Sequence, residues 1–138
     1  MAAMHALHAM ILFFLLIGTP ALGQNIYDVA EAHLDADGVQ RMELIADNYF
    51  YRPNYLVVQA GVPVELTIIR ESWLVPHDFV LHAPEAGIDV STSIDSEGTK
   101  IRFTPMQPGK FTFYCEEKLL FLESHREKGM EGIIEVKP

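Results

Sequence analysis

The sequence predicts an all-β protein, folded as a sandwich or a barrel. Two observations support this prediction. First, short segments rich in β-branched and aromatic residues recur about every ten residues, with Gly, Pro, Asn or Asp between them. Second, several of these segments alternate apolar and polar residues, which is the pattern of a strand with one buried face. The chain has 138 residues, a length that indicates one domain.

The first half of the folded region supplies four expected strands. Residues 39–46 (VQRMELIA) alternate apolar and polar side chains, and residues 54–61 (NYLVVQAG) end in a turn-forming glycine. Residues 62–70 (VPVELTIIR) are rich in β-branched residues, and residues 77–83 (HDFVLHA) follow a proline. Such compositions fit a pleated, half-buried surface, so we expect a strand in each range.

The second half continues this pattern with one exception. Residues 84–100 contain the turn sequences PEAG and DSEG, and the turn QPGK comes later. We expect strands in residues 101–105 (IRFTP), 111–115 (FTFYC) and 132–138 (GIIEVKP). The exception is residues 116–129 (EEKLLFLESHREKG). Their apolar residues are grouped as in a helix, so we expect a short helix there.

Residues 1–23 have the pattern of a secretory signal peptide. Residues 9–18 are uncharged and almost wholly apolar, and small residues precede the expected cleavage after Gly23. The alternative is an uncleaved membrane anchor, but this apolar core is shorter than the roughly 20 residues of a spanning helix. We expect an exported protein without a stable membrane anchor, in which residues 24–38 form a polar lead-in and residues 39–138 form the folded domain.

The chain that remains after cleavage is strongly acidic. The sequence has 19 Asp and Glu residues against 10 Lys and Arg residues, a net charge of −9, and none of them lies in the signal segment. A negative protein is repelled by nucleic acid and by anionic membrane surfaces, so neither is an expected partner. The charge is compatible with a basic protein partner, and equally with solubility alone.

Cys115 is the only cysteine of the chain, so it cannot form an internal disulfide. In an exported protein it is a free thiol, part of an intermolecular disulfide, or a metal ligand. Alternate residues of a strand share a face, so Cys115 points toward the core together with Phe111 and Phe113. By the same rule, His77 points inward and His82 points to the opposite face.

Two further potential donors follow Cys115 at short spacings. The pattern is Cys-x9-His-x4-Met, with His125 and Met130 in the segment before the last expected strand. Together with His77, these residues form the donor set of a blue copper centre, a trigonal His2Cys site with a weak axial Met. A structural zinc site more often has paired cysteine or histidine ligands. Gly129 allows the chain to turn sharply before Met130.

The motifs PHDF, FTFYC and SHREKGMEG resemble those of the cupredoxins, the family of plastocyanins, azurins and the blue-copper domains of copper nitrite reductases. The resemblance covers about residues 39–137. It implies a Greek-key β-sandwich with a mononuclear copper near one end, bound by His77, Cys115, His125 and Met130, and with one histidine edge near the surface. The long loop from cysteine to histidine is similar to that of nitrite reductases and of small periplasmic copper-tolerance cupredoxins, which implies a periplasmic location.

Some positions depart from the family pattern. Asp78 replaces the asparagine that usually follows the first histidine and ties the ligand loops together. A carboxylate is expected either to make this connection less well or to lower the reduction potential through its negative charge. Tyr114 stands where nitrite reductases have a histidine before the cysteine. His82 falls where those enzymes place a ligand of a second copper. The resemblance therefore implies that the second copper site is absent and that the protein is not an enzyme.

These features lead to three functional hypotheses. The first is a one-electron carrier whose partner is a redox protein such as a basic cytochrome c. The second is periplasmic copper tolerance or sequestration, which the shared ligands do not separate from the first. The third is a Cys–His hydrolase, which needs Cys115 as an exposed, activated thiolate. Trp73 and Phe121 are expected either in the core or in a partner-binding surface.

Overall fold

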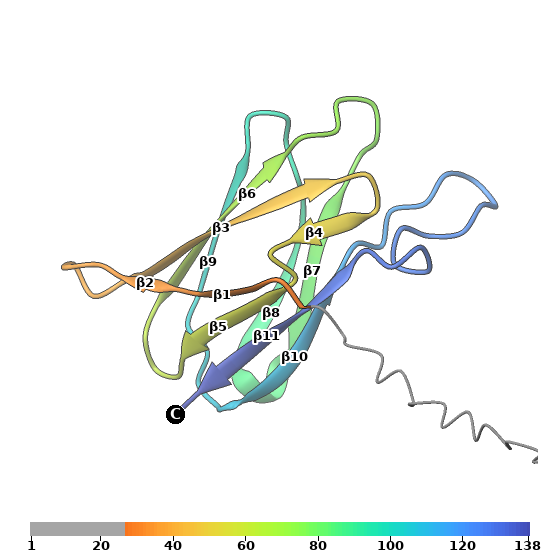
Figure 1. Cartoon of the computed structure of the whole chain (residues 1–138). Coiled ribbons are helices and arrows are strands. Elements are labelled where there is room, and N and C mark those ends of the chain that lie inside the picture. The colour runs from red at the N-terminus through yellow and green to blue at the C-terminus, as the bar shows by residue number, and fades with distance from the viewer. Residues whose placement is uncertain (1–26) are drawn as a thin grey trace, which may run out of the picture.

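The computed structural model describes residues 27–138, so the predicted signal peptide lies outside the described residues. Residues 27–138 fold as a β-sandwich of two packed sheets, which confirms the predicted fold class (Figure 1). The one helix in this range is a short 3-10 turn, Pro84–Ala86. No helix of the described range has the length and apolar character needed to cross a membrane.

The first sheet has six strands in the order β1-β5-β11-β10-β7-β8. These strands are β1 Val29–Glu31, β5 Tyr55–Gln59, β7 Asp78–Ala83, β8 Ile88–Ser93, β10 Gly109–Tyr114 and β11 Glu131–Lys137. β10 pairs antiparallel with both β7 and β11, so it lies in the interior of the sheet. The ends of β7, β10 and β11 therefore lie side by side, where the segments carrying the predicted ligands begin and end.

The second sheet has five strands, in the order β2-β3-β6-β9, with β4 paired to β3. These strands are β2 His33–Leu34, β3 Gln40–Asp47, β4 Phe50–Arg52, β6 Val64–Arg70 and β9 Thr99–Phe103. β3 and β6 are parallel, as are β5 and β11, because the chain crosses from one sheet to the other between them. Such crossings are typical of Greek-key sandwiches.

Each strand predicted from the sequence is present, with small shifts at its ends. The structure adds β4 and β8, and also β1 and β2, which lie within the predicted lead-in. Because β1 pairs with β5 and β2 pairs with β3, residues 29–34 belong to the sandwich. These two strands are only three and two residues long, too short for an alternating pattern to reveal them.

The predicted helix in residues 116–129 is wrong. The segment consists of turns and irregular backbone. Its apolar residues 119–122 are consecutive and exposed, so they form no stripe that packs one helix face against the sandwich. The backbone instead bonds back to the strand end, where the Arg126 N–H donates to the Cys115 carbonyl at 3.1 Å. This tertiary attachment overrides the helical propensity of the segment.

The core lies between the sheets and includes an aromatic cluster near one end. Phe79 of β7 and Phe113 of β10 stack with ring centroids 5.3 Å apart, and Tyr51 of β4 contacts both rings edge-on. β7 begins just after His77, and β10 ends just before Cys115. Because β7 and β10 are antiparallel neighbours, their pairing brings these two predicted ligands to the same end of the sandwich.

Candidate metal centre

Three of the predicted ligands meet at this end of the sandwich. The Sγ atom of Cys115 lies 3.4 Å from Nδ1 of His125 and 4.0 Å from Nδ1 of His77. The two Nδ1 atoms are 3.2 Å apart. Within residues 27–138, this is the one group of three or more His, Cys, Asp or Glu side chains whose donor atoms all lie within 4.8 Å of one another. All three side chains are buried.

The triangle of donor atoms has the size that a trigonal metal ion requires. Bonds from zinc to imidazole nitrogen and thiolate sulfur are about 2.0 to 2.3 Å long, so a trigonal ion of similar size separates its donors by about 3.5 to 3.8 Å. The observed separations of 3.2, 3.4 and 4.0 Å bracket this range. A soft thiolate suits Cu(I), and imidazole suits copper generally. The donor set therefore fits a copper ion.

Backbone hydrogen bonds fold the loop between β10 and β11 against the site. The Cys115 N–H donates to the Met130 carbonyl at 3.1 Å, and the Met130 N–H donates to the His125 carbonyl at 2.9 Å. Met130 is fully buried. Gly129 adopts a left-handed φ of 98°, so it makes the sharp turn predicted for it. These two backbone hydrogen bonds therefore hold Met130, the fourth predicted ligand, next to Cys115 and His125.

The ring of His77 is oriented by Ser72, a residue that the sequence analysis missed. Nε2 of His77 lies 2.8 Å from Oγ of Ser72, whose hydroxyl donates to the Val75 carbonyl at 3.2 Å. Because the hydroxyl proton is used there, the Nε2–H of His77 donates to Ser72, and the Nδ1 lone pair faces Cys115. A loop serine five residues before a histidine carries no signal of this role in the sequence.

Asp78 connects the two segments that carry the ligands. Its backbone N–H points at Sγ of Cys115 at 3.5 Å, and its carboxylate accepts the N–H of Glu116 at 2.7 Å. The carbonyl of Asp78 accepts the hydroxyl of Tyr51, a second residue that the sequence analysis missed. Asp78 therefore makes the connection that the resemblance assigns to an asparagine, because this connection uses only an acceptor oxygen.

Burial sets the protonation of the three donor groups. Burial, with His125 nearby, lowers the pKa of His77 to about 4. Burial also lowers the pKa of His125 and raises the pKa of Cys115 to about 12. In the metal-free protein at neutral pH, both imidazoles are therefore neutral and the thiol is protonated. A metal ion that binds these groups displaces a proton from Cys115.

The same properties disfavour the hydrolase hypothesis. A nucleophilic cysteine sits in a partly exposed, electropositive setting that lowers its pKa. The side chain of Cys115 is 0% exposed, and burial raises its pKa instead. A substrate carbonyl has no open approach to this sulfur, whereas a metal ion bound among the three donors lies within reach of it.

The other histidines of the described chain lie away from this cluster. His82 is on the outer face of β7, as strand alternation predicts, with its side chain 62% exposed and its Nδ1 3.1 Å from Asp89. His33 is exposed beside Asp35. Neither belongs to a further group of converging donor atoms within residues 27–138.

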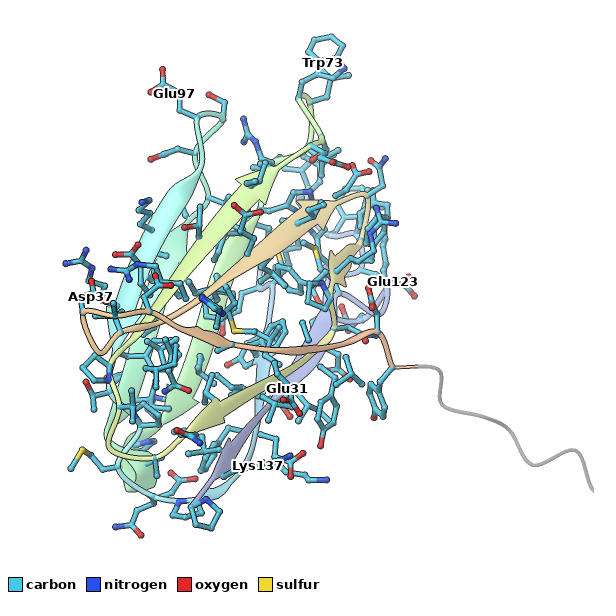
Figure 2. The ribbon with its side chains drawn as sticks, turned by 60° about the vertical axis from the view of Figure 1, so that its left-hand side comes forward. Glu31, Asp37, Trp73, Glu97, Glu123 and Lys137 are labelled. Carbon is cyan, nitrogen blue, oxygen red and sulfur yellow. The ribbon has the colours of Figure 1, made fainter. Side chains whose placement is uncertain are left out.

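The two loops that flank His125 carry exposed apolar residues, of which Leu74 and Leu119 line a cavity with His125. Trp73 is 82% exposed and Phe121 is 91% exposed, so both lie at the surface and not in the core. Figure 2 shows Trp73 projecting from the tip of the loop between β6 and β7. His125 itself is only 6% exposed. A cavity of about 190 Å³ lies next to it, lined by Tyr49, Leu74, Val75, Pro76, Glu117, Lys118 and Leu119.

Comparison with known families supports the assignment of this site. The sequence matches the family described as "Cupredoxin-like domain" over residues 7–129. The chain therefore belongs to the cupredoxin-like family. With the buried group of His77, Cys115 and His125, this fold supports a single copper site. None of the curated protein sequences compared with it matches.

Solved structures with the same fold include several copper proteins. The metal-binding domain of the Cu(I)-exporting P-type ATPase CopA of Streptococcus pneumoniae, solved with Cu(I), is 25% identical, covers 82% of this chain and 99% of its own, and has a TM-score of 0.62. The auracyanin of Roseiflexus castenholzii is 21% identical over 71% of this chain and 97% of its own, with a TM-score of 0.57. The copper nitrite reductase of Nitrosomonas europaea is 27% identical over 72% of this chain but 42% of its own, with a TM-score of 0.56.

Proposed function

We propose that this protein is a periplasmic one-electron carrier and not an enzyme. The observation that carries this proposal is the buried triangle of donor atoms from His77, Cys115 and His125. These three residues would hold a copper ion, with Met130 as a weak fourth donor. A copper ion held there would supply the Cu(I)/Cu(II) couple. The uncharged apolar segment 9–18 supports export to the periplasm.

The hydrogen bonds around the donors suit electron transfer. Ser72 orients His77, Asp78 donates its N–H to Cys115, and the backbone of Met130 is bonded to both flanking ligand residues. Donors held in this way move little when the charge of the site changes, so each transfer needs little rearrangement. Their burial also keeps water away from the metal.

Two residues support the absence of a second, catalytic copper. Tyr114 replaces the histidine that such a site needs, and its ring lies 3.9 Å from the guanidinium carbon of Arg126. His82 is on the outer face of β7 and contacts Asp89. Neither residue supplies a free imidazole beside Cys115. We therefore assign no reductase chemistry to this chain.

The apolar residues around His125 support a route for electrons to a partner. Leu74 and Leu119 line the cavity next to His125, and Trp73 and Phe121 extend from the same two loops. Apolar contact at this end, combined with a net charge of −9 over the chain, suits a basic redox protein such as a cytochrome c. We propose that electrons leave through His125 toward such a partner.

The copper site is tested by adding Cu(II) to the purified mature protein and recording its visible spectrum. We expect an intense thiolate-to-copper band that saturates at one equivalent of copper per chain. Cys115→Ser removes this band, because a hydroxyl does not replace the thiolate. His82→Gln, which changes an exposed histidine outside the cluster, leaves the band intact. A copper-saturated protein without such a band would overturn the assignment.

Electron transfer is tested by mixing the reduced copper protein with a ferric cytochrome c and following both absorbances in a stopped-flow instrument. We expect oxidation of the copper protein and reduction of the cytochrome with equal rate constants. Cys115→Ser shows no such reaction. A protein that gives the copper band but exchanges no electrons with basic redox proteins would leave the site correct and the carrier function wrong.

A second candidate function is the handling of periplasmic copper. It is favoured by the 25% identity to a domain solved with Cu(I), the metal-binding domain of the exporter CopA. The same four residues would then sequester copper and protect the cell. A deletion strain separates the two functions: copper sensitivity with normal respiration supports copper handling, whereas a respiratory defect with normal copper tolerance supports the carrier.

A further inference from the structure

Tyr49 lies against His125, although the two residues are far apart in the sequence. Its ring centroid is 4.9 Å from that of the imidazole, with an interplanar angle of 78°. The ammonium of Lys128 lies over the Tyr49 ring, 4.2 Å from its centroid, which is a cation–π distance. His125 is in a surface loop, yet it is only 6% exposed. The contact with Tyr49 is one cause of that low exposure.

The backbone of Tyr49 is held in a conformation that a tyrosine rarely adopts. Asp47 of β3 pairs with Phe50 of β4, so Asn48 and Tyr49 form the turn between these strands. Tyr49 has a φ of 64°, in the left-handed region where glycine is the usual residue. A bulky side chain in this region is a steric outlier that persists only where surrounding contacts hold it. For Tyr49, these contacts include the rings and charges of His125 and Lys128.

We propose that Tyr49 is a positioning residue of the metal centre, whose ring covers His125 and limits passage between the site and solvent. The cavity beside His125, whose walls include Tyr49, Leu74 and Leu119, is the path that this ring narrows. Copper ions and small reagents reach His125 along it. The inference requires only the copper site, so it holds for a carrier and for a copper-handling protein alike.

The test uses the metal-free protein and the reaction of diethyl pyrocarbonate with each histidine, followed by peptide mass spectrometry at about pH 8, where imidazole is neutral. The chain contains its own references, because His82 and His33 are exposed and His77 is 1% exposed. In the wild type, we expect His125 to react far more slowly than His82. Reaction of His125 as fast as that of His82 would overturn the proposal.

Three variants separate the effect of the Tyr49 ring from the effect of the Tyr49 backbone. Tyr49→Gly removes the ring and suits the left-handed turn, so we expect the His125 rate to rise about tenfold while His77 stays protected. Tyr49→Phe keeps the ring and leaves the His125 rate unchanged. Lys128→Gln removes the cation over the ring and raises the rate by a smaller factor. In the copper-loaded protein, Tyr49→Gly also speeds transfer of Cu(I) to a chelator such as bathocuproine disulfonate.

Two further results would overturn the proposal. One is an equal His125 rate in the wild type, Tyr49→Gly and Lys128→Gln. The other is joint exposure of His77 and His125 in Tyr49→Gly with an unchanged rate in Lys128→Gln, because Tyr49 would then only stabilise the fold. Reaction of His82 serves as the reference in every sample, since this side chain lies on the outer face of β7.

Discussion

Asp78 shows how a change of one atom in a side chain alters a metal site without altering its architecture. Its Oδ1 accepts the N–H of Glu116, and its backbone N–H points at Cys115. An asparagine would accept the same bond through its amide oxygen. The difference between the two residues is therefore the negative charge of the carboxylate, which favours Cu(II) over Cu(I).

We predict that Asp78→Asn raises the reduction potential by tens of millivolts, since about 59 mV corresponds to a tenfold change in a one-electron equilibrium. The measurement is a redox titration of the copper band. Asp89→Asn removes an exposed carboxylate beside His82 and serves as the matched control. Equal potentials in the wild type and Asp78→Asn would show that this charge has no influence on the site.

The role proposed for Met130 depends on its sulfur alone. The side chain is fully buried, and its backbone bonds do not involve the thioether. We predict that Met130→Leu shifts the copper band and raises the reduction potential, because loss of the weak axial donor destabilises Cu(II). The free energy of unfolding should fall by less than about 1.5 kcal/mol, since the two side chains have similar volumes. Met42→Leu, a buried change in β3, is the control. An unchanged band and potential in Met130→Leu would remove Met130 from the ligand set.

The raised pKa of Cys115 predicts a pH dependence of copper binding. Because burial raises this pKa to about 12, the thiol is protonated throughout the neutral range. The pKa of His77 lies at about 4 and that of His125 is lowered, so neither imidazole releases a proton in this range. Copper binding then releases one proton, and the apparent affinity rises about tenfold per pH unit between about pH 7 and pH 9.

Competition titrations with a copper buffer at several pH values measure this slope. Cys115→Ser should lose the slope together with most of its affinity, whereas His82→Gln should keep both. An affinity that does not change with pH would mean that Cys115 is already a thiolate in the metal-free protein, contrary to its burial.

At the scale of the elements, one glycine of β11 leaves the space that an aromatic ring of β10 occupies. A Cβ atom at Gly132 would lie 2.3 Å from Cζ of Phe113 and 2.6 Å from the carbonyl oxygen of Asn54. The Phe113 ring is stacked on Phe79 and has little freedom to move away. Gly132 therefore lets the strand that follows Met130 pack against the aromatic cluster next to the site.

We predict that Gly132→Ala lowers the free energy of unfolding by about 1 to 3 kcal/mol, the usual cost of overpacking a core. Urea denaturation followed by fluorescence measures the change. Thr112→Ala, at an exposed position on β10, is the control and should change stability by less than about 0.5 kcal/mol. A free energy of unfolding equal to that of the wild type would show that β10 and β11 accommodate the added methyl group without cost.

Local patterns predicted the strands of this protein well and its loops poorly. The strand predicted in residues 111–115 is present as Gly109–Tyr114, and its facing was predicted correctly, because strand alternation is a property of consecutive residues. The segment 116–129 was predicted wrongly, because its course depends on bonds to Cys115 and on the return to β11. Those bonds belong to the folded chain and leave no periodic trace in the sequence.

At the scale of the whole molecule, the position of the site and the net charge affect how the protein meets a partner. The site lies at the end from which the loop before β11 projects, and the C-terminus lies at the other end of that strand (Figure 1). Exposed apolar residues gather at the site end, including Trp73 and Phe121. The net charge of −9 acts over a longer distance than these contacts.

We predict that the rate constant for electron transfer to a basic cytochrome c falls on the order of tenfold as ionic strength rises from about 0.01 to 0.1 M, because salt screens the attraction between opposite charges. Stopped-flow measurements at several salt concentrations test this. An acidic redox protein is the control, and its rate should rise with salt. A rate constant for the basic partner that does not change with ionic strength would mean that the acidic surface does not assist the encounter.

The sequence by itself determined the chemistry that this protein carries: the types of donor atom, their spacing, and the inward direction of His77 and Cys115. These properties depend on residue identity and on neighbours in the chain. Only the tertiary structure decided what surrounds the donors, including Ser72 beside His77 and Tyr49 beside His125. The physical reason is that such contacts join separate segments, and their partners are chosen by strand pairing between β7 and β10 and by the fold of the loop before β11, which no local pattern encodes.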